Sequence, residues 1–129
     1  MAGVLPFVAA LFAQVPAVPP QSGPVVQFAQ VLNQPVLLSI DGGATEQAPP
    51  LSKKRFALEP GRHTFTITTS TGRRIEATYD LRAEDAAEVK GGRFWCVLLV
   101  GETVEDEAGA DLLRMSVEGC RDYIKLGKD

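Results

Sequence analysis

Hydrophobic and polar residues along much of this chain alternate with a period of two, the pattern of a half-buried β-strand. The alternation is clearest at residues 74–81, where the apolar side chains from Ile75 to Leu81 are separated by charged or hydroxyl-bearing ones. Residues 63–69 alternate in the same way and are rich in β-branched side chains, which favour strands. The segment between them, 70–73, contains a glycine and predicts a short hairpin connection.

Further segments of the same kind bring the prediction to about seven strands. They cover residues 25–32, 36–41, 54–59, 93–100 and 112–118, with a loop predicted at 44–52. Residues 93–100 are apolar on both faces, which predicts a central strand covered from both sides. Turn-forming residues recur about every 8 to 12 positions, a spacing typical of sandwiches. The expected fold is therefore all-β, a single antiparallel β-sandwich. Short helical turns are expected near 83–89, and the tail at 121–129 either forms a short helix or lies over the sandwich.

The beginning of the chain differs in composition from the rest. No charged residue precedes Asp41, and all nine prolines lie at or before Pro60. Residues 1–13 form an apolar stretch that is too short to span a bilayer and resembles a secretory signal, although no Lys or Arg precedes it. Residues 14–24 then read as a Pro/Gln-rich linker and 25–129 as the sandwich domain. We expect a periplasmic or secreted protein; an uncleaved apolar arm and a misplaced start codon remain the alternatives.

The charge balance and the scarcity of reactive side chains exclude several classes of function. Sixteen acidic and thirteen basic residues give a net charge of −3, which argues against nucleic acid and anionic membranes as general partners. One histidine and two cysteines leave almost no material for a zinc site or a histidine-based relay. We expect no catalytic residue, no cofactor and no metal site. The basic clusters 53–55 and 73–74 are interpreted as solvated loop and edge residues that discourage aggregation.

One part of the chain carries a recognisable turn pattern. A hydrophobic strand ends in Asp41-Gly42, and after a loop the sequence Leu58-Glu59-Pro60-Gly61-Arg62-His63 leads into the next strand. Over roughly residues 33–80 this pattern resembles the PEGA domain family. The resemblance implies a small β-sandwich of the transthyretin or carboxypeptidase-regulatory kind, common in bacterial envelope proteins and without catalytic activity. Asp41, Gly42, Pro60, Gly61 and His63 are expected to build its turns.

The two cysteines are the strongest candidates for covalent chemistry. In an exported protein an even number of cysteines predicts a disulfide, here Cys96–Cys120, which closes a loop worth about 3.5 kcal/mol in the loop-entropy estimate. The alternative is a pair of buried free thiols in a cytosolic protein.

Three hypotheses about function follow. The first is a non-catalytic, exported binding or structural module, an accessory or scaffold component of a bacterial envelope assembly. It takes a protein partner, and strand addition at a free edge is one mode of binding. The second is a small-ligand or glycan-binding protein that stacks its ligand on Trp95, Tyr79 or Tyr123, although Trp95 is equally explained by packing. The third is a hydrolase that uses the acidic-loop carboxylates of residues 105–107. Homo-oligomer formation stays open.

Overall fold

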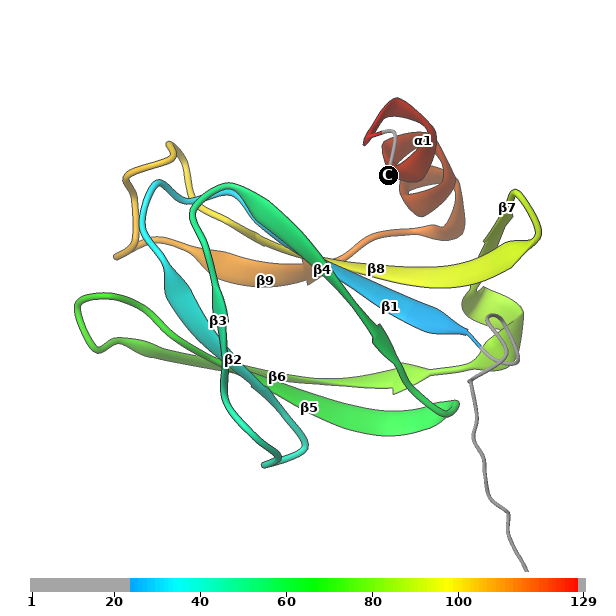
Figure 1. Ribbon diagram of the computed structural model, residues 1–129, viewed down its shortest axis with the longest axis horizontal. Helices are drawn as coiled ribbons and strands as arrows, with labels where there is room; N and C mark the ends of the chain where they lie inside the picture. The colour runs from blue at the N-terminus through cyan, green and yellow to red at the C-terminus, as the bar shows by residue number, and fades with distance from the viewer. Residues whose placement is uncertain (1–23, 128–129) are drawn as a thin grey trace, which may run out of the picture.

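The computed structural model describes residues 24–127 and places them in two layers of β-sheet with one helix on the outside (Figure 1). The predicted segments 1–13 and nearly all of 14–24 lie outside the described residues. The elements are β1 Val25–Gln30, β2 Val36–Ile40, β3 Glu46–Ala48, β4 Ser52–Ala57, β5 Gly61–Thr68, β6 Arg74–Leu81, the 3₁₀ turn η1 Ala83–Asp85, β7 Ala87–Val89, β8 Gly92–Val100, β9 Asp111–Arg114 and the helix α1 Val117–Gly127. The predicted all-β sandwich with a short C-terminal helix is confirmed.

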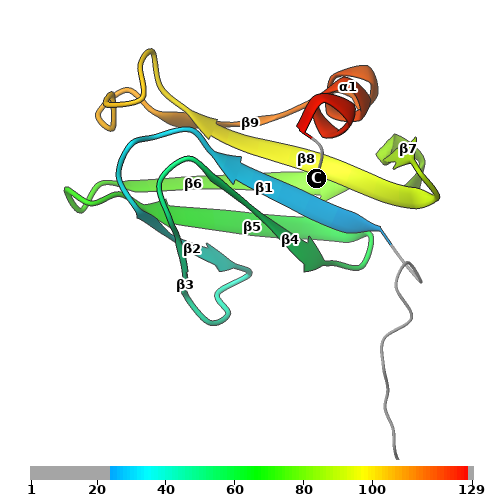
Figure 2. The ribbon, with the colours of Figure 1, turned by 45° about the horizontal axis from the view of Figure 1, so that its top comes forward.

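The strands form two sheets. Sheet A has the order β4-β1-β8-β7, with β9 also pairing with β8, and sheet B has the order β3-β2-β5-β6. All pairings are antiparallel except one: β1 and β8 run parallel, from Val25 opposite Phe94 to Gln30 opposite Leu99. Figure 2 shows these two central strands pointing in the same direction. The prediction of a purely antiparallel sandwich is therefore wrong at this one pairing. The chain alternates between the sheets: after β1 it forms β2 and β3 in sheet B, returns to sheet A for β4, forms β5 and β6 in sheet B, and then returns to sheet A, where β8 lies parallel beside β1.

Several segments differ from their predicted boundaries; the strand predicted at 54–59, for example, is β4 at Ser52–Ala57. The loop predicted at 44–52 contains the short strand β3 and the first residue of β4. The segment 83–89 holds one 3₁₀ turn, but its second half is β7. The strand predicted at 112–118 ends at Arg114, because the chain turns into α1 at Val117, and Met115 and Val117 pack into the apolar cluster beneath this helix. Ser116 begins this helix by accepting a hydrogen bond at its Oγ from the amide of Gly119, at 3.1 Å.

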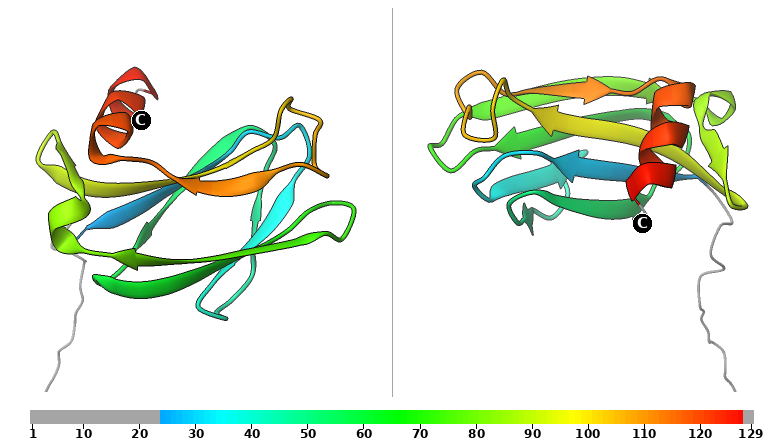
Figure 3. Two further views of the ribbon diagram at one scale, coloured as in Figure 1. Left: turned by 180° about the vertical axis from the view of Figure 1, so that it is seen from behind. Right: turned by 90° about the horizontal axis from the view of Figure 1, so that it is seen from above.

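The core lies between the two sheets, and a smaller apolar cluster lies beneath α1. Phe28 and Val97 of sheet A meet Phe65 and Ile67 of sheet B, all of them fully or almost fully buried. The second cluster joins β7, β8 and α1 on the face of sheet A that points away from sheet B; Figure 3 shows α1 lying across these strands. The prediction that 93–100 is covered on both sides is thus confirmed. Among residues 24–127, no helix is long and apolar enough to cross a membrane.

Candidate functional site

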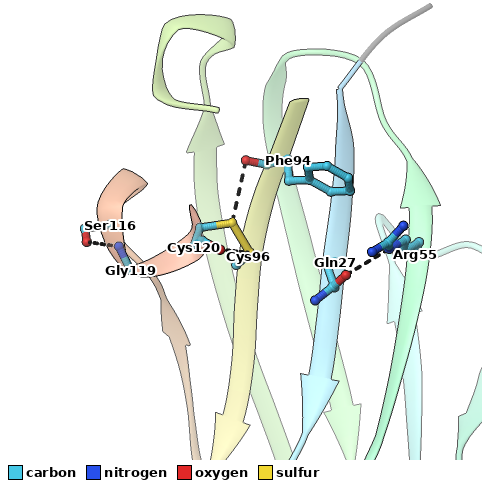
Figure 4. The surroundings of a disulfide bond; sticks show 7 residues. All are labelled: Gln27, Arg55, Phe94, Cys96, Ser116, Gly119 and Cys120. Carbon is cyan, nitrogen blue, oxygen red and sulfur yellow. Dashed lines mark hydrogen bonds between the residues drawn. A yellow bond between two sulfur atoms is a disulfide. The ribbon is translucent and has the colours of Figure 1, made fainter. Parts of the chain in front are cut away.

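The predicted disulfide is present and ties α1 to the central strand of sheet A. Cys96 on β8 and Cys120 on α1 are bonded at an S–S distance of 2.00 Å, with their Cα atoms 5.5 Å apart (Figure 4). On the neighbouring strand the buried Gln27 accepts a hydrogen bond at Oε1 from Arg55 Nε, at 2.8 Å. Gln27 Nε2 has no hydrogen-bond partner among residues 24–127. The bridge fixes the helix over the outer face of sheet A.

Asp41 and His63 join the two turns that the sequence pattern singles out. The His63 ring donates from Nδ1 to the Asp41 carboxylate and from Nε2 to the Glu59 carbonyl oxygen, at 2.7 Å. The other Asp41 oxygen accepts from the amide of Thr64 at 2.8 Å. Because both ring nitrogens face acceptors, this arrangement fits the doubly protonated imidazolium. The ring therefore anchors the turns, and no nucleophile lies within these contacts.

The electrostatics of this pair follow from the same contacts. Burial on its own lowers the pKa of His63, but the hydrogen bond to Asp41, the Glu59 carbonyl and the Asp41 charge together raise that pKa above 6.5. Burial likewise favours a higher pKa for Asp41, yet its hydrogen bonds from His63 and Thr64 and the His63 charge hold that pKa below 3.8. Both groups are therefore predominantly charged between pH 3.8 and 6.5, where they form an ion pair.

The remaining predicted turn residues lie where the sequence places them. Gly42 follows Asp41 in the turn after β2, and both have positive φ, 72° and 56°. Gly61 opens β5 directly after Pro60 with φ 143°, a conformation open to glycine and strained for other residues.

The three aromatic residues proposed as a stacking face do not share a surface. Trp95 is only 2% exposed, faces the core between the sheets, and donates from Nε1 to the Arg82 carbonyl at 3.0 Å. Tyr79 is half-buried on β6 and packs against Phe65, with ring centroids 5.8 Å apart. Tyr123 belongs to the cluster on the far side of sheet A, beneath α1. The prediction of one shared aromatic binding face is thus wrong, because the strand alternation directs Trp95 inward.

The acidic loop between β8 and β9 uses its carboxylates to hold itself together. Asp106 accepts from the amides of Glu102 and Gly109 at 3.0 and 2.9 Å, and these hydrogen bonds lower its pKa. Glu107 is buried and accepts from Ser70 Oγ in the β5–β6 hairpin at 2.7 and 2.9 Å. Within residues 24–127, no three His, Cys, Asp or Glu side chains are grouped so as to hold a metal ion. These contacts give the carboxylates of Asp106 and Glu107 a structural explanation.

Arg73, interpreted from sequence as a solvated cation, belongs to the same contact. Its guanidinium Nη1 donates to the carbonyl oxygens of Glu107 and Ala110, at 2.9 and 2.8 Å. The hairpin that leads into β6 is therefore fixed to the loop of the opposite sheet.

A shallow polar groove of about 310 Å³ lies on the outer face of sheet B. It is lined by Leu37, Ser39, Gly42, Gly43, Thr45, Thr66, Thr68 and Arg74. The lining offers four hydroxyl groups, and a guanidinium that is 70% exposed and 3.7 Å from Glu76. Such a surface can donate hydrogen bonds to a small hydroxylated or anionic molecule.

The long edge of sheet B is the second candidate surface. β6 pairs with β5 on one side, and no strand of residues 24–127 pairs with its other side (Figure 3). The Thr69 amide donates to the Arg73 carbonyl, which fixes the order of the antiparallel ladder. Hydrogen-bonded pairs alternate from there, so the odd-numbered residues of β6 bond to β5. The main-chain groups of Arg74, Glu76 and Thr78 therefore point out of the sheet.

This edge is longer and more open than the others in the described part of the chain. β3 and β7 have three residues each and β9 has four, whereas β6 has eight. β4 has six residues but carries the cations of 53–55, which deter pairing with another strand. β9 lies near one part of β6, and its Arg114 Nη1 donates to the Asp80 carbonyl at 3.1 Å, which covers the far end of the strand. The sequence prediction of free edges did not single out β6, although its eight alternating residues were the available indication.

Comparisons of this chain with protein-family models, with curated proteins and with solved structures find no match, so the resemblance to the PEGA domain family stays a prediction.

Proposed function

We propose that this chain is a non-catalytic, extracytoplasmic module that binds a protein segment by strand addition along β6. Its role would be that of an accessory or structural component of a bacterial envelope assembly, the setting that the PEGA-like turn pattern suggests. The observation that carries the proposal is the row of outward-pointing main-chain groups at Arg74, Glu76 and Thr78.

The side chains around this edge favour an extended peptide as the occupant. Ala77 and Tyr79 point toward the sandwich interior and remain partly exposed at its open side. An added strand with apolar residues at alternate positions would cover them while its main chain bonds to β6. The disulfide supports the compartment, since such bonds persist in oxidising environments.

Selection of displayed random peptides on the full chain tests the proposal. We expect the enriched peptides to alternate apolar and polar residues and to lose binding to Thr78→Pro, because proline removes an outward amide needed by the added strand. Thr78→Val is the matched control: it loses the hydroxyl but keeps the amide, so binding should persist. Equal binding to all three proteins contradicts the proposal.

Amide hydrogen exchange on the unaltered protein tests the same geometry without a substitution. Binding of an enriched peptide should protect the amides of Glu76 and Thr78, which point outward, while the Ala77 amide is protected with or without the peptide. Protection that is not confined to alternate residues of β6 places the peptide elsewhere. Intact-mass measurement of the native protein with and without reductant tests the compartment. A protein that carries the disulfide gains the mass of two hydrogens when the reductant is added.

The groove on sheet B favours a second candidate function, the binding of a hydroxyl-rich acid such as a uronic acid. Its four hydroxyl groups and the exposed Arg74 guanidinium carry this alternative in place of an aromatic platform. Titration calorimetry with D-glucuronate is expected to give millimolar binding that Arg74→Gln weakens by about tenfold. Heats equal to those of dilution contradict it.

A further inference from the structure

We propose that the segment bound at β6 is β6 of a second copy of this chain, paired antiparallel about a two-fold axis at Ala77. This inference rests on the proposed strand addition and names its partner. In this register Arg74 lies opposite Asp80 of the second copy, and Glu76 lies opposite Thr78. The two B sheets then become one continuous sheet across the dimer.

The hydrogen-bonding pattern of β6 limits the registers to a few. In an antiparallel pair, residues whose main-chain groups point toward the partner strand must face one another. These are Arg74, Glu76, Thr78 and Asp80. If most of the two β6 strands is to overlap, the two-fold axis can therefore pass only through Glu76, Ala77 or Thr78.

The charges select one of these three registers. An axis at Glu76 places two Glu76 carboxylates directly opposite, and an axis at Thr78 places Glu76 opposite Asp80; both pairings are repulsive. An axis at Ala77 opposes no like charges and places Arg74 opposite Asp80 twice, once on each side of the axis. The outward-facing residues of β6 all have exposed side chains on the same outer face of sheet B: Arg74, Glu76, Thr78 and Asp80.

The opposite face of the strand fits the same register. Ala77 faces itself at the axis in a non-hydrogen-bonded pair, where main chains approach most closely and a small side chain is favourable. Ile75 faces Tyr79 of the second copy, a β-branched and aromatic combination that stabilises cross-strand pairs. The partly exposed Tyr79 ring would be covered. About six main-chain hydrogen bonds form in addition, because the Asp80 carbonyl already accepts Arg114.

Charge reversal tests the register, with sedimentation equilibrium of the full chain as the measurement. We expect the unaltered protein to dimerise, and Arg74→Asp or Asp80→Arg to raise the dimer dissociation constant by about tenfold, because each change makes two cross-strand pairs repulsive. The double variant Arg74→Asp/Asp80→Arg restores the opposite charges and should return the constant to within about threefold of the original. Lys54→Asp, on the edge of sheet A, is the control and should leave it unchanged.

The outcomes separate this inference from the proposed function. A protein that stays monomeric at the highest soluble concentration overturns self-pairing, whereas peptide binding that depends on the Thr78 amide would still support strand addition. A dimer that the double variant does not restore overturns the register. A dimer whose dissociation constant is unchanged by Thr78→Pro forms through another surface. If peptide binding is also unchanged by Thr78→Pro, self-pairing and strand addition at β6 are both overturned. Near-ultraviolet circular dichroism of the buried Trp95 checks that each variant is folded.

Discussion

Replacing His63 with glutamine should destabilise the protein by an amount that depends on pH. His63 is the only histidine in the chain, and its ring links Asp41 in one turn to Glu59 in another. A glutamine side chain keeps some of the volume but cannot carry the positive charge. The substitution therefore removes the charge-assisted part of both contacts.

The magnitude follows from the exposure of the two partners. Hydrogen bonds to charged groups contribute about 1.5 to 3 kcal/mol each, but the Asp41 side chain is 44% exposed and solvent weakens its attraction to the ring. We therefore expect His63→Gln to lower the free energy of unfolding by about 1–2 kcal/mol at pH 5.5.

The sign of the pH dependence follows from the two pKa directions. The folded pKa of His63 is raised above 6.5, so its contribution is complete below that pH and is lost as the pH rises through the folded value. The folded pKa of Asp41 is lowered below 3.8, so its contribution is present above that pH and is lost as the pH falls through the folded value. The pair is strongest between these ordinary values.

Urea unfolding followed by the fluorescence of Trp95, the single tryptophan, measures the effect. Between pH 5.5 and 8.5 the unaltered protein should lose about 1 kcal/mol more stability than His63→Gln. The terminal amino group also titrates in this range, but it is common to both proteins and cancels in the difference. The same loss in both proteins, or a ring pKa at or below 6.5 in an NMR titration, would refute the reasoning.

Further substitutions test the disulfide, a buried amide and the core tryptophan. Replacing Cys96 and Cys120 together with alanine should lower the free energy of unfolding by about 3.5 kcal/mol, and an unchanged urea midpoint would contradict this. Gln30→Leu should cost about 2–4 kcal/mol, because the buried amide serves the Leu32 amide and three carbonyl oxygens; a cost below 1 kcal/mol would mean that water replaces it. Trp95→Phe should cost about 1–3 kcal/mol, read by circular dichroism during thermal unfolding.

The strands could be predicted from sequence where burial on one face imposes a clean alternation. β5 and β6 are such strands, with Phe65, Ile67 and Ile75 facing the core. The predicted extent of β6 agrees with the structure, whereas β5 begins two residues before its predicted start. The alternation gave a wrong prediction beyond Arg114, where the chain forms a helix. A few alternating apolar residues fit either a strand or one side of a helix packed on a sheet, so the pattern cannot distinguish the two. β3 has too few residues for a pattern to form.

The site was harder to predict because its determinants are long-range. The even number of cysteines predicted the disulfide, and the turn pattern named Asp41 and His63. Whether Trp95 faces the core or solvent depends on the register of β8 between two layers, which the apolar run leaves undetermined. Likewise, which strand ends a sheet depends on topology. The parallel pairing of β1 with β8 places both inside sheet A and leaves β6 at the edge of sheet B.

Arg74 belongs to both candidate surfaces, which gives the two a thermodynamic connection. Its guanidinium lines the groove on sheet B, and in the proposed dimer it faces Asp80 of the second copy. A bound carboxylate and a facing Asp80 would compete for the same cation, so each should weaken the other by the same factor. D-glucuronate is therefore expected to raise the dimer dissociation constant, whereas D-glucose, which lacks the carboxylate, should not. A dimer constant that stays fixed while glucuronate saturates the groove would show that Arg74 does not serve both surfaces.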